Sequence, residues 1–259
     1  MGFALTASVL NAGPIEFTDV TAGSGIVYDY DRDGSVTVGD YNGDGWLDVL
    51  VTGSDVTGVQ LFRNNGNKTF TNVTAAVLPA NISRAHMGLF ADMDDDGDED
   101  LLLGAYYARN DSALELLVNT GGVFSYSPQD LSFTHDYSRV GGIPVGDMDG
   151  DRDLDLFFTH KPGPNFYLRN DGINQLVDQT AWFGADLNLY DDICSDGVTF
   201  TCPDRTMSTV LVEMNGDRIP DLYAAVDVGG NYYGRSVPGQ QHVYSLPDSG
   251  GAGYGQDMG

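Results

Sequence analysis

One short acidic motif occurs four times along the chain, and it restricts the possible folds more than any other feature of the sequence. Its copies begin at Asp40, Asp92, Asp147 and Glu213, which are 52, 55 and 66 residues apart. The first copy reads DYNGDGWLD and the second reads DMDDDGDED. This spacing is too short for a domain and fits one supersecondary unit. The sequence therefore predicts a fold built from repeated units.

Each copy places oxygen-bearing side chains at its first, third, fifth and ninth positions, and a tight loop can direct such groups to one point. The backbone carbonyl of the seventh position can add a ligand. Numerous, flexible and mostly anionic oxygen ligands suit Ca²⁺ better than Mg²⁺. We predict about four calcium ions, held by these residues: Asp40, Asn42, Asp44, Trp46, Asp48, Asp92, Asp94, Asp96, Asp98, Asp100, Asp147, Asp149, Asp151, Asp153, Asp155, Glu213, Asn215, Asp217, Ile219 and Asp221.

The four loops are not EF-hands, although an EF-hand loop begins in a similar way. An EF-hand needs a bidentate glutamate at position twelve and a helix on each side. Position twelve is here Val51, Leu103, Phe158 or Ala224. Each loop is followed by a short apolar run, such as LDVLVTG at 47–53, which predicts a strand.

The residues around each loop complete a unit of four strands. A short strand precedes the loop, a second strand follows it, and a hairpin comes next. The hairpins are marked by turn signals at Asn65-Gly66, Gly121-Gly122 and Asp171-Gly172.

This pattern resembles the FG-GAP or VCBS-type repeat of integrin α-chain β-propellers, as in VGDYNGDGWLDVLV at 38–51 and FTNVT at 70–74. The resemblance implies an all-β fold, a β-propeller of four-stranded antiparallel blades with calcium loops between the first and second strands. About four blades fit in this chain. It also implies a secreted or cell-surface protein. Arg152 and Arg218 stand where the family usually has glycine, and Glu213 opens the fourth loop, so we expect a weaker fourth site.

The chain divides into three expected segments: an N-terminal strand or signal remnant at 1–13, the repeats at 14–246, and a Gly-rich flexible tail at 247–259. The last copy is expected to supply three strands. FTDVT at 17–21 resembles a fourth strand, and it could close a four-bladed ring or complete a blade of a neighbouring molecule. A piece of a longer chain is the third alternative.

The charge of the chain excludes some partners. Its 38 acidic and 12 basic residues give a formal charge of −26, which argues against nucleic acid and anionic membranes. No apolar run is long enough for membrane insertion. Cys194 and Cys202 fit a local disulfide, which indicates an oxidising compartment.

No common catalytic motif is present in the sequence. The family resemblance therefore implies a secreted or cell-surface module that binds a glycan or an extracellular protein without catalysis. Two alternatives stay open. One is a structural subunit of an extracellular filament or surface assembly, joined by exchange of terminal strands. The other is a polysaccharide lyase with His160 beside Lys161 as the base. No motif in the sequence identifies the cognate ligand.

Overall fold

The computed structural model describes most of the repeat region of the chain. The described residues are 16–28, 34–53, 58–80, 82, 84–107, 113–129, 131, 139–161, 165–172, 175–180, 206–226, 232–235 and 243–245. The expected terminal segments at 1–13 and 247–259 and the cysteine pair Cys194 and Cys202 lie outside these residues.

The described chain forms four antiparallel sheets, here called blades 1 to 4, each with its strands in sequence order. Blade 1 consists of β1 (Val36–Gly39), β2 (Asp48–Val51), β3 (Gln60–Asn64) and β4 (Phe70–Asn72). Blade 2 consists of β5 (Arg84–Ala91), β6 (Asp100–Tyr107), β7 (Leu114–Asn119) and β8 (Phe124–Tyr126). Blade 3 consists of β9 (Arg139–Gly142), β10 (Val145–Gly146), β11 (Asp155–Lys161), β12 (Phe166–Asn170) and β13 (Leu176–Asp178). Blade 4 consists of β14 (Thr206–Val212), β15 (Asp221–Val226), β16 (Tyr232–Arg235) and β17 (Val243–Ser245).

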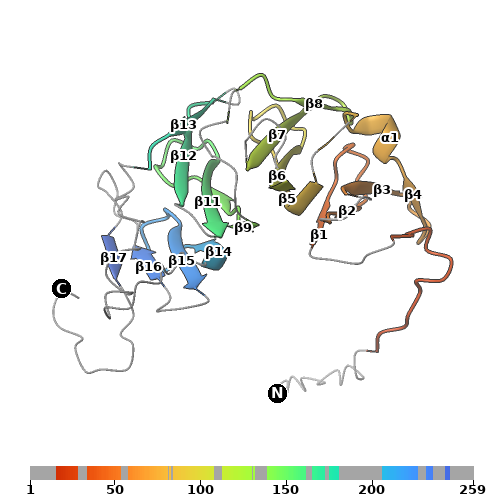
Figure 1. Cartoon of the computed structure of the whole chain (residues 1–259), viewed down its shortest axis with the longest axis horizontal. Helices are drawn as coiled ribbons and strands as arrows, with labels where there is room; N and C mark the ends of the chain where they lie inside the picture. The colour runs from red at the N-terminus through yellow and green to blue at the C-terminus, as the bar shows by residue number, and fades with distance from the viewer. Residues whose placement is uncertain are drawn as a thin grey trace, which may run out of the picture.

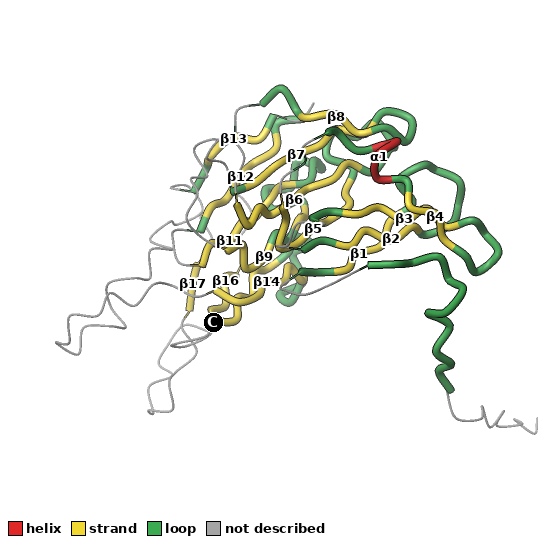
Figure 2. Tube along the Cα trace, turned by 45° about the vertical axis from the view of Figure 1, so that its right-hand side comes forward, coloured by secondary structure: helices red, strands yellow, loops and turns green. Residues whose placement is uncertain are grey.

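The fold is all-β, with propeller-like blades as the sequence predicts. Figure 2 shows that helix is limited to α1 (Thr74–Val77) among the residues described. This one-turn helix is far too short to cross a membrane, and the described residues contain no other candidate span.

The first strand of blade 3 is split into β9 and β10, which both pair with β11. The break falls at Ile143 and Pro144. Proline has no backbone N–H to donate, so it cannot take a full place in the hydrogen-bond ladder. Its carbonyl still accepts a hydrogen bond from the Phe157 backbone N–H at 3.0 Å. The two pieces therefore act as one interrupted strand.

Blade 4 corrects one prediction from the sequence, because the last repeat supplies four strands rather than three. The strand that was missed is β16, a short segment without clear apolar alternation, and it pairs with both β15 and β17. Residues 17–21 form no strand, and Phe17 is almost fully exposed. The segment FTDVT is therefore not needed to complete this blade.

The hydrophobic core lies between successive blades. One cluster joins blades 1 and 2 and includes Leu50 and Phe90. A second joins blades 2 and 3 and includes Leu102 and Leu156. A third joins blades 3 and 4 around Tyr167. Because strand side chains alternate between the two faces of a sheet, an inner blade buries one set against each neighbour.

The four blades follow one another along an arc, and blades 1 and 4 stay apart at its two ends (Figure 1). The first strands are neighbours in turn, with β1 beside β5, β5 beside β9, and β9 beside β14. They surround an open pocket of about 440 Å³, lined by residues from all four of these strands. The first strands are therefore the innermost ones, as in a propeller.

Candidate metal centres

The four acidic loops occupy the same place in their blades. Loop 1 (residues 40–48), loop 2 (92–100), loop 3 (147–155) and loop 4 (213–221) each join the first strand of a blade to its second. The register is also the same, because the residue before each loop lies opposite the aspartate at loop position nine. Gly39 lies opposite Asp48, and Val212 lies opposite Asp221. The predicted position of the loops between the first and second strands is confirmed.

All four loops share one backbone conformation. The fourth and sixth positions have left-handed backbone angles in each loop, with φ of 67° and 85° at Gly43 and Gly45 of loop 1. Loops 3 and 4 have arginine at the sixth position, with φ of 89° at Arg152 and 75° at Arg218. The conformation costs a residue with a Cβ about 1–2 kcal/mol, yet these loops adopt it. The loop geometry therefore does not require glycine at the sixth position.

Short-range hydrogen bonds hold the side chains inside the loop. In loop 1 the Asp44 backbone N–H donates to Asn42 Oδ1 at 2.9 Å, and the Trp46 N–H donates to Asp44 Oδ1 at 2.9 Å. Loop 3 repeats the arrangement, because the Asp153 N–H donates to Asp151 Oδ1 at 2.9 Å. The third and fifth side chains are thereby turned toward the centre of the loop.

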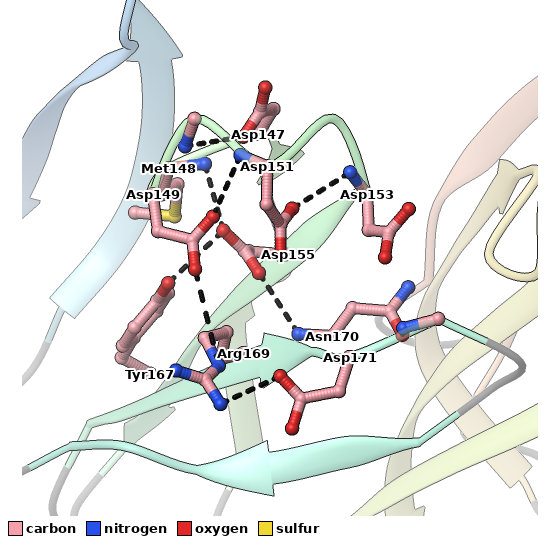
Figure 3. A network of polar contacts seen from close by, with 12 residues as sticks. Asp147, Met148, Asp149, Asp151, Asp153, Asp155, Tyr167, Arg169, Asn170 and Asp171 are labelled. Atoms are coloured by element: carbon pink, nitrogen blue, oxygen red, sulfur yellow. Dashed lines mark hydrogen bonds and ion pairs between the residues drawn. The ribbon is translucent and has the colours of Figure 1, made fainter.

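Carboxylates converge in loops 2 and 3. Oxygen atoms of Asp92, Asp94 and Asp96 lie within 4.8 Å of one another, and a second group of this kind joins Asp147, Asp149 and Asp151. Figure 3 shows how closely the side chains of loop 3 lie together. In loops 1 and 4 an asparagine replaces the third-position carboxylate. Three carboxylates so close repel one another unless a cation lies among them.

The aspartate at the ninth position lies beneath this group and has a second role that the sequence did not reveal. Asp100 is fully buried. Its Oδ2 accepts a hydrogen bond from the Met93 N–H at 3.1 Å, and its Oδ1 accepts one from the Asn119 N–H at 2.8 Å. Asp155 makes the same two contacts with Met148 and Asn170, and it also accepts one from the Tyr167 hydroxyl. This residue therefore ties the loop to the third strand.

Loop 1 provides a test of whether a cation fits. Asp48 is fully buried, and its Oδ1 accepts a hydrogen bond from the Asn64 N–H at 2.7 Å. Its buried Oδ2 makes no hydrogen bond of standard geometry in the described part of the chain, although the Tyr41 backbone N–H still lowers the pKa of this carboxyl. Burial, together with the nearby Asp44 and Asp40, raises the pKa of Asp48 to about 6. A buried carboxylate oxygen beside two more carboxylates fits a hard cation with oxygen ligands.

In loops 2 and 3 the pKa of the ninth-position aspartate is raised in the same way. Burial raises the pKa of Asp100 to about 6, with contributions from Asp94 and Asp96. Burial also raises the pKa of Asp155 to about 7. Without a metal, the deepest carboxyl groups of loops 1 to 3 thus bind a proton more readily than an ordinary aspartate does. A bound dication would favour the ionised form instead.

A positively charged side chain from another strand borders loop 3, and the sequence did not predict it there. The Arg169 side chain comes from β12, and its Nη2 lies 2.7 Å from Asp171 Oδ1. Its Nε lies 4.0 Å from Asp149 Oδ2, so the guanidinium borders the acidic group (Figure 3). Arg169 therefore offsets part of the negative charge of this loop.

Loop 4 uses its polar groups differently. Glu213 Oε1 accepts hydrogen bonds from the backbone N–H groups of Asn215 and Gly216. Asn215 Nδ2 donates to Asp221 Oδ1 at 3.1 Å, so this amide already partners the deepest carboxylate. The weaker fourth site stays a prediction from the sequence.

An asparagine at the end of the third strand joins neighbouring loops. Asn119 is fully buried, and its Nδ2 donates to the Tyr41 carbonyl of loop 1 at 2.7 Å and to the Glu99 carbonyl of loop 2 at 2.9 Å. Asn170 Nδ2 bonds the Met93 carbonyl of loop 2 at 2.7 Å. The backbones of loops 1 and 2 are thus each linked by a hydrogen bond to the next blade.

The candidate base of the lyase alternative, His160, lies in β11 opposite Val140 of β9. The side chains of His160 and Lys161 are outside the described part of the structure. The lyase alternative therefore stays a prediction from the sequence.

Comparisons with known proteins give a family and similar solved structures. A family model described as FG-GAP-like repeat matches residues 40–103 and 92–158. No curated protein matches the chain. A lectin from Agrocybe aegerita, solved to explain specific recognition of non-reducing terminal N-acetylglucosamine, is similar with a TM-score of 0.48 and 18% identity. The match covers 83% of this chain and 52% of the lectin, so the chain spans about half the length of that structure.

Proposed function

Because this chain belongs to the proteins built from FG-GAP-like repeats, we propose that it is a secreted or cell-surface, calcium-binding propeller module that binds a glycan or an extracellular protein without catalysis. In this proposal, calcium binds in the loops between the first and second strands. The carboxylates of positions one, three, five and nine and the carbonyl of position seven are the proposed ligands.

The observation that carries the proposal is the convergence of three carboxylates in loop 2 and of three in loop 3, with oxygen atoms within 4.8 Å of one another. Such a group of ionised oxygens is costly unless a cation neutralises it. In loop 1, the buried carboxylate of Asp48 and its acidic neighbours Asp44 and Asp40 support the same chemistry.

Calcium would act here as a structural ion rather than a catalytic one. It would neutralise the loop that joins the first and second strands of a blade. Loops of moderate affinity fill with calcium where the ion is abundant, as it is outside cells, where modules with Kd values of about 10⁻⁴–10⁻³ M are common. This agrees with the proposed location.

The direct test is calorimetric titration of chelator-treated protein with CaCl₂. We expect saturable binding of more than one ion, and Mg²⁺ at the same concentrations should bind more weakly. The double variant Asp94→Asn with Asp96→Asn should lose one binding event. A matched control, Asp19→Asn with Asp178→Asn, changes the net charge equally on exposed aspartates outside the loops and should keep all events.

Loss of binding in both double variants would show a diffuse charge effect rather than a site. No saturable binding in the unmodified protein would reject the calcium assignment. The partner class is tested separately, by applying labelled protein to a glycan array and to extracellular-matrix proteins with calcium and with chelator. Signals that require calcium support the module.

A further inference from the structure

The two end blades expose side chains that inner blades bury. We call the face of a blade that is turned toward the next blade its forward face, and the opposite one its backward face. On forward faces the second loop residue is buried, since Met93 and Met148 are each 1% exposed. The same residue of blade 4, Met214, is 49% exposed. In β15 Tyr223 is exposed, whereas its equivalent in β11, Phe157, is buried.

The backward faces show the same contrast. Phe90 of blade 2 is buried against Gly39 of blade 1, where an added Cβ would lie 2.6 Å from Phe90 Cδ2. Leu211 of blade 4 packs toward Gly146 of blade 3, at 3.2 Å from the corresponding Cβ position. The equivalent residue of blade 1 is Val38, which is 54% exposed.

The exposed residues form one patch at each end of the arc. Val36 and Leu47 extend the surface around Val38, and the equivalent of Leu47 in blade 3, Leu154, packs into the core between blades 2 and 3. Val210 and Val212 extend the surface around Met214. We name the backward patch (Val36, Val38, Leu47) and the forward patch (Val210, Val212, Met214, Tyr223), of which Val36 and Val210 also line the pocket between the first strands.

A hydrogen-bond donor accompanies the backward patch. Asn119 and Asn170 each donate from Nδ2 to two carbonyls, one in their own loop and one in the preceding blade. Asn64 is the equivalent residue of blade 1, and its Nδ2 donates to the Leu47 carbonyl of its own loop at 3.0 Å. Asn64 Nδ2 therefore lacks the second acceptor, a carbonyl of a preceding blade, among the described residues. In the inner blades that acceptor is Tyr41 or Met93, and the equivalent residue at the forward end is Met214.

We propose that the forward patch of one molecule docks onto the backward patch of a second copy of this chain, in the geometry of the inner blade–blade interfaces. Both patches consist of positions that already meet one another inside the chain, so one surface is the natural complement of the other. The contact is head-to-tail and thus heterologous. The described parts of two copies would together supply eight blades, a number found in closed propellers.

The inner interfaces also suggest how tight the new contact is. The residue before the loop is small at each inner interface: Gly39, Ala91 and Gly146. At the forward end it is Val212, which in the proposed contact would meet Val38, whereas Gly39 meets Phe90 and Gly146 meets Leu211 inside the chain. In the proposed contact the forward residue, Val212, is larger than glycine or alanine, and the backward residue, Val38, is smaller than phenylalanine or leucine. The two changes in side-chain volume offset each other, so the space between the blades can still be filled.

The test is native mass spectrometry and analytical ultracentrifugation of the whole chain in CaCl₂. We expect a concentration-dependent dimer. Val38→Asp and Val212→Asp should each weaken dimerisation about tenfold or more, because a charge would be buried without a partner. Val212→Ala restores the residue type of Ala91 and should dimerise at least as well as the original. Val123→Asp alters an exposed valine outside both patches and should have no effect.

Mixing the variants distinguishes a head-to-tail contact from a symmetric one. Val38→Asp keeps an intact forward patch, and Val212→Asp keeps an intact backward patch, so the mixture should form a heterodimer through one good contact. A monomer at all concentrations would overturn the proposal. So would dimers that survive either aspartate variant alone, or a mixture that stays monomeric. Thermal melting of each variant confirms that it is folded.

Discussion

The aspartate at the ninth loop position is the residue on which most local interactions depend. In blades 2 and 3 it accepts backbone hydrogen bonds from its own loop and from the third strand. These contacts favour its ionised form, whereas burial and the neighbouring carboxylates favour the protonated form. Burial is the larger influence, so without metal the pKa values of these two carboxyl groups are raised.

Acid is therefore expected to stabilise the metal-free protein within a defined pH range. The folded-state pKa values of about 6 for Asp48 and Asp100 and about 7 for Asp155 lie above the usual aspartate value near 4. The folded state then binds more protons than the unfolded state, and stability falls as pH rises through this range. Chelator-treated protein should melt at a lower temperature at pH 8 than at pH 5.

The control for the pH prediction is the same melting series in saturating CaCl₂. Bound calcium requires ionised carboxylates, so the fall in melting temperature should shrink or reverse. A metal-free protein whose melting temperature rises from pH 5 to pH 8 would contradict the prediction.

Substitutions at the fifth loop position should separate a strong site from a weak one. Asp96→Ala removes a carboxylate from the convergent group of loop 2 and should weaken calcium binding there about tenfold or more. Asp217→Ala in loop 4 should have a smaller effect, because Asn215 already bonds Asp221 and Arg218 adds positive charge. Calcium titration measures both. Equal and negligible changes would contradict the assignment of the loops as metal sites.

At this scale the sequence predicted the members of the loops but not all their contacts. Spacing alone placed Asp92, Asp94 and Asp96 together, because three alternate residues of a tight loop must share one centre. It did not predict Arg169 beside Asp149, since that contact joins β12 to a loop in front of β11. Such contacts depend on strand pairing and leave no local pattern in the sequence.

The elements of the fold are held together by asparagines that act across blade boundaries. Asn119→Ala should lower the free energy of unfolding by about 3 kcal/mol or more, because it leaves buried carbonyls without their donors, at about 1–3 kcal/mol each. Asn64→Ala is the matched control, since Asn64 bonds only within its own blade in the described structure and should cost about 1 kcal/mol. Urea unfolding followed by circular dichroism measures both. Equal losses would contradict a role of Asn119 between blades.

Most strands were predictable because each combines an apolar run with a loop or turn at a fixed offset. The blade-forming hairpins at Asn65-Gly66 and Gly121-Gly122 follow from local turn chemistry, with left-handed φ of 70° at Gly66. β16 was missed because a four-residue segment carries too little periodicity to be recognised. The split between β9 and β10 shows the opposite case, in which a single proline decides the local structure.

For the whole molecule, calcium removal should have a large effect. The chain has a formal charge of −26, and each filled loop would offset two of these charges. If three loops bind about tenfold tighter than the free calcium concentration, together they add about 4 kcal/mol. For a domain of this size that corresponds to roughly 10 °C in melting temperature. Differential scanning fluorimetry with and without chelator measures the shift, and Mg²⁺ should not restore it fully. An unchanged melting temperature would contradict the prediction.

The asparagine hydrogen bonds connect the loops in one direction along the arc. The Asn119 backbone N–H donates to Asp100 of loop 2, and its side chain donates to the Tyr41 carbonyl of loop 1. Asn170 makes the same two contacts with Asp155 of loop 3 and the Met93 carbonyl of loop 2. An ion that orders one loop therefore prepares the loop before it. Occupancy would then spread from site to site, and the binding curve would rise with a Hill coefficient above one.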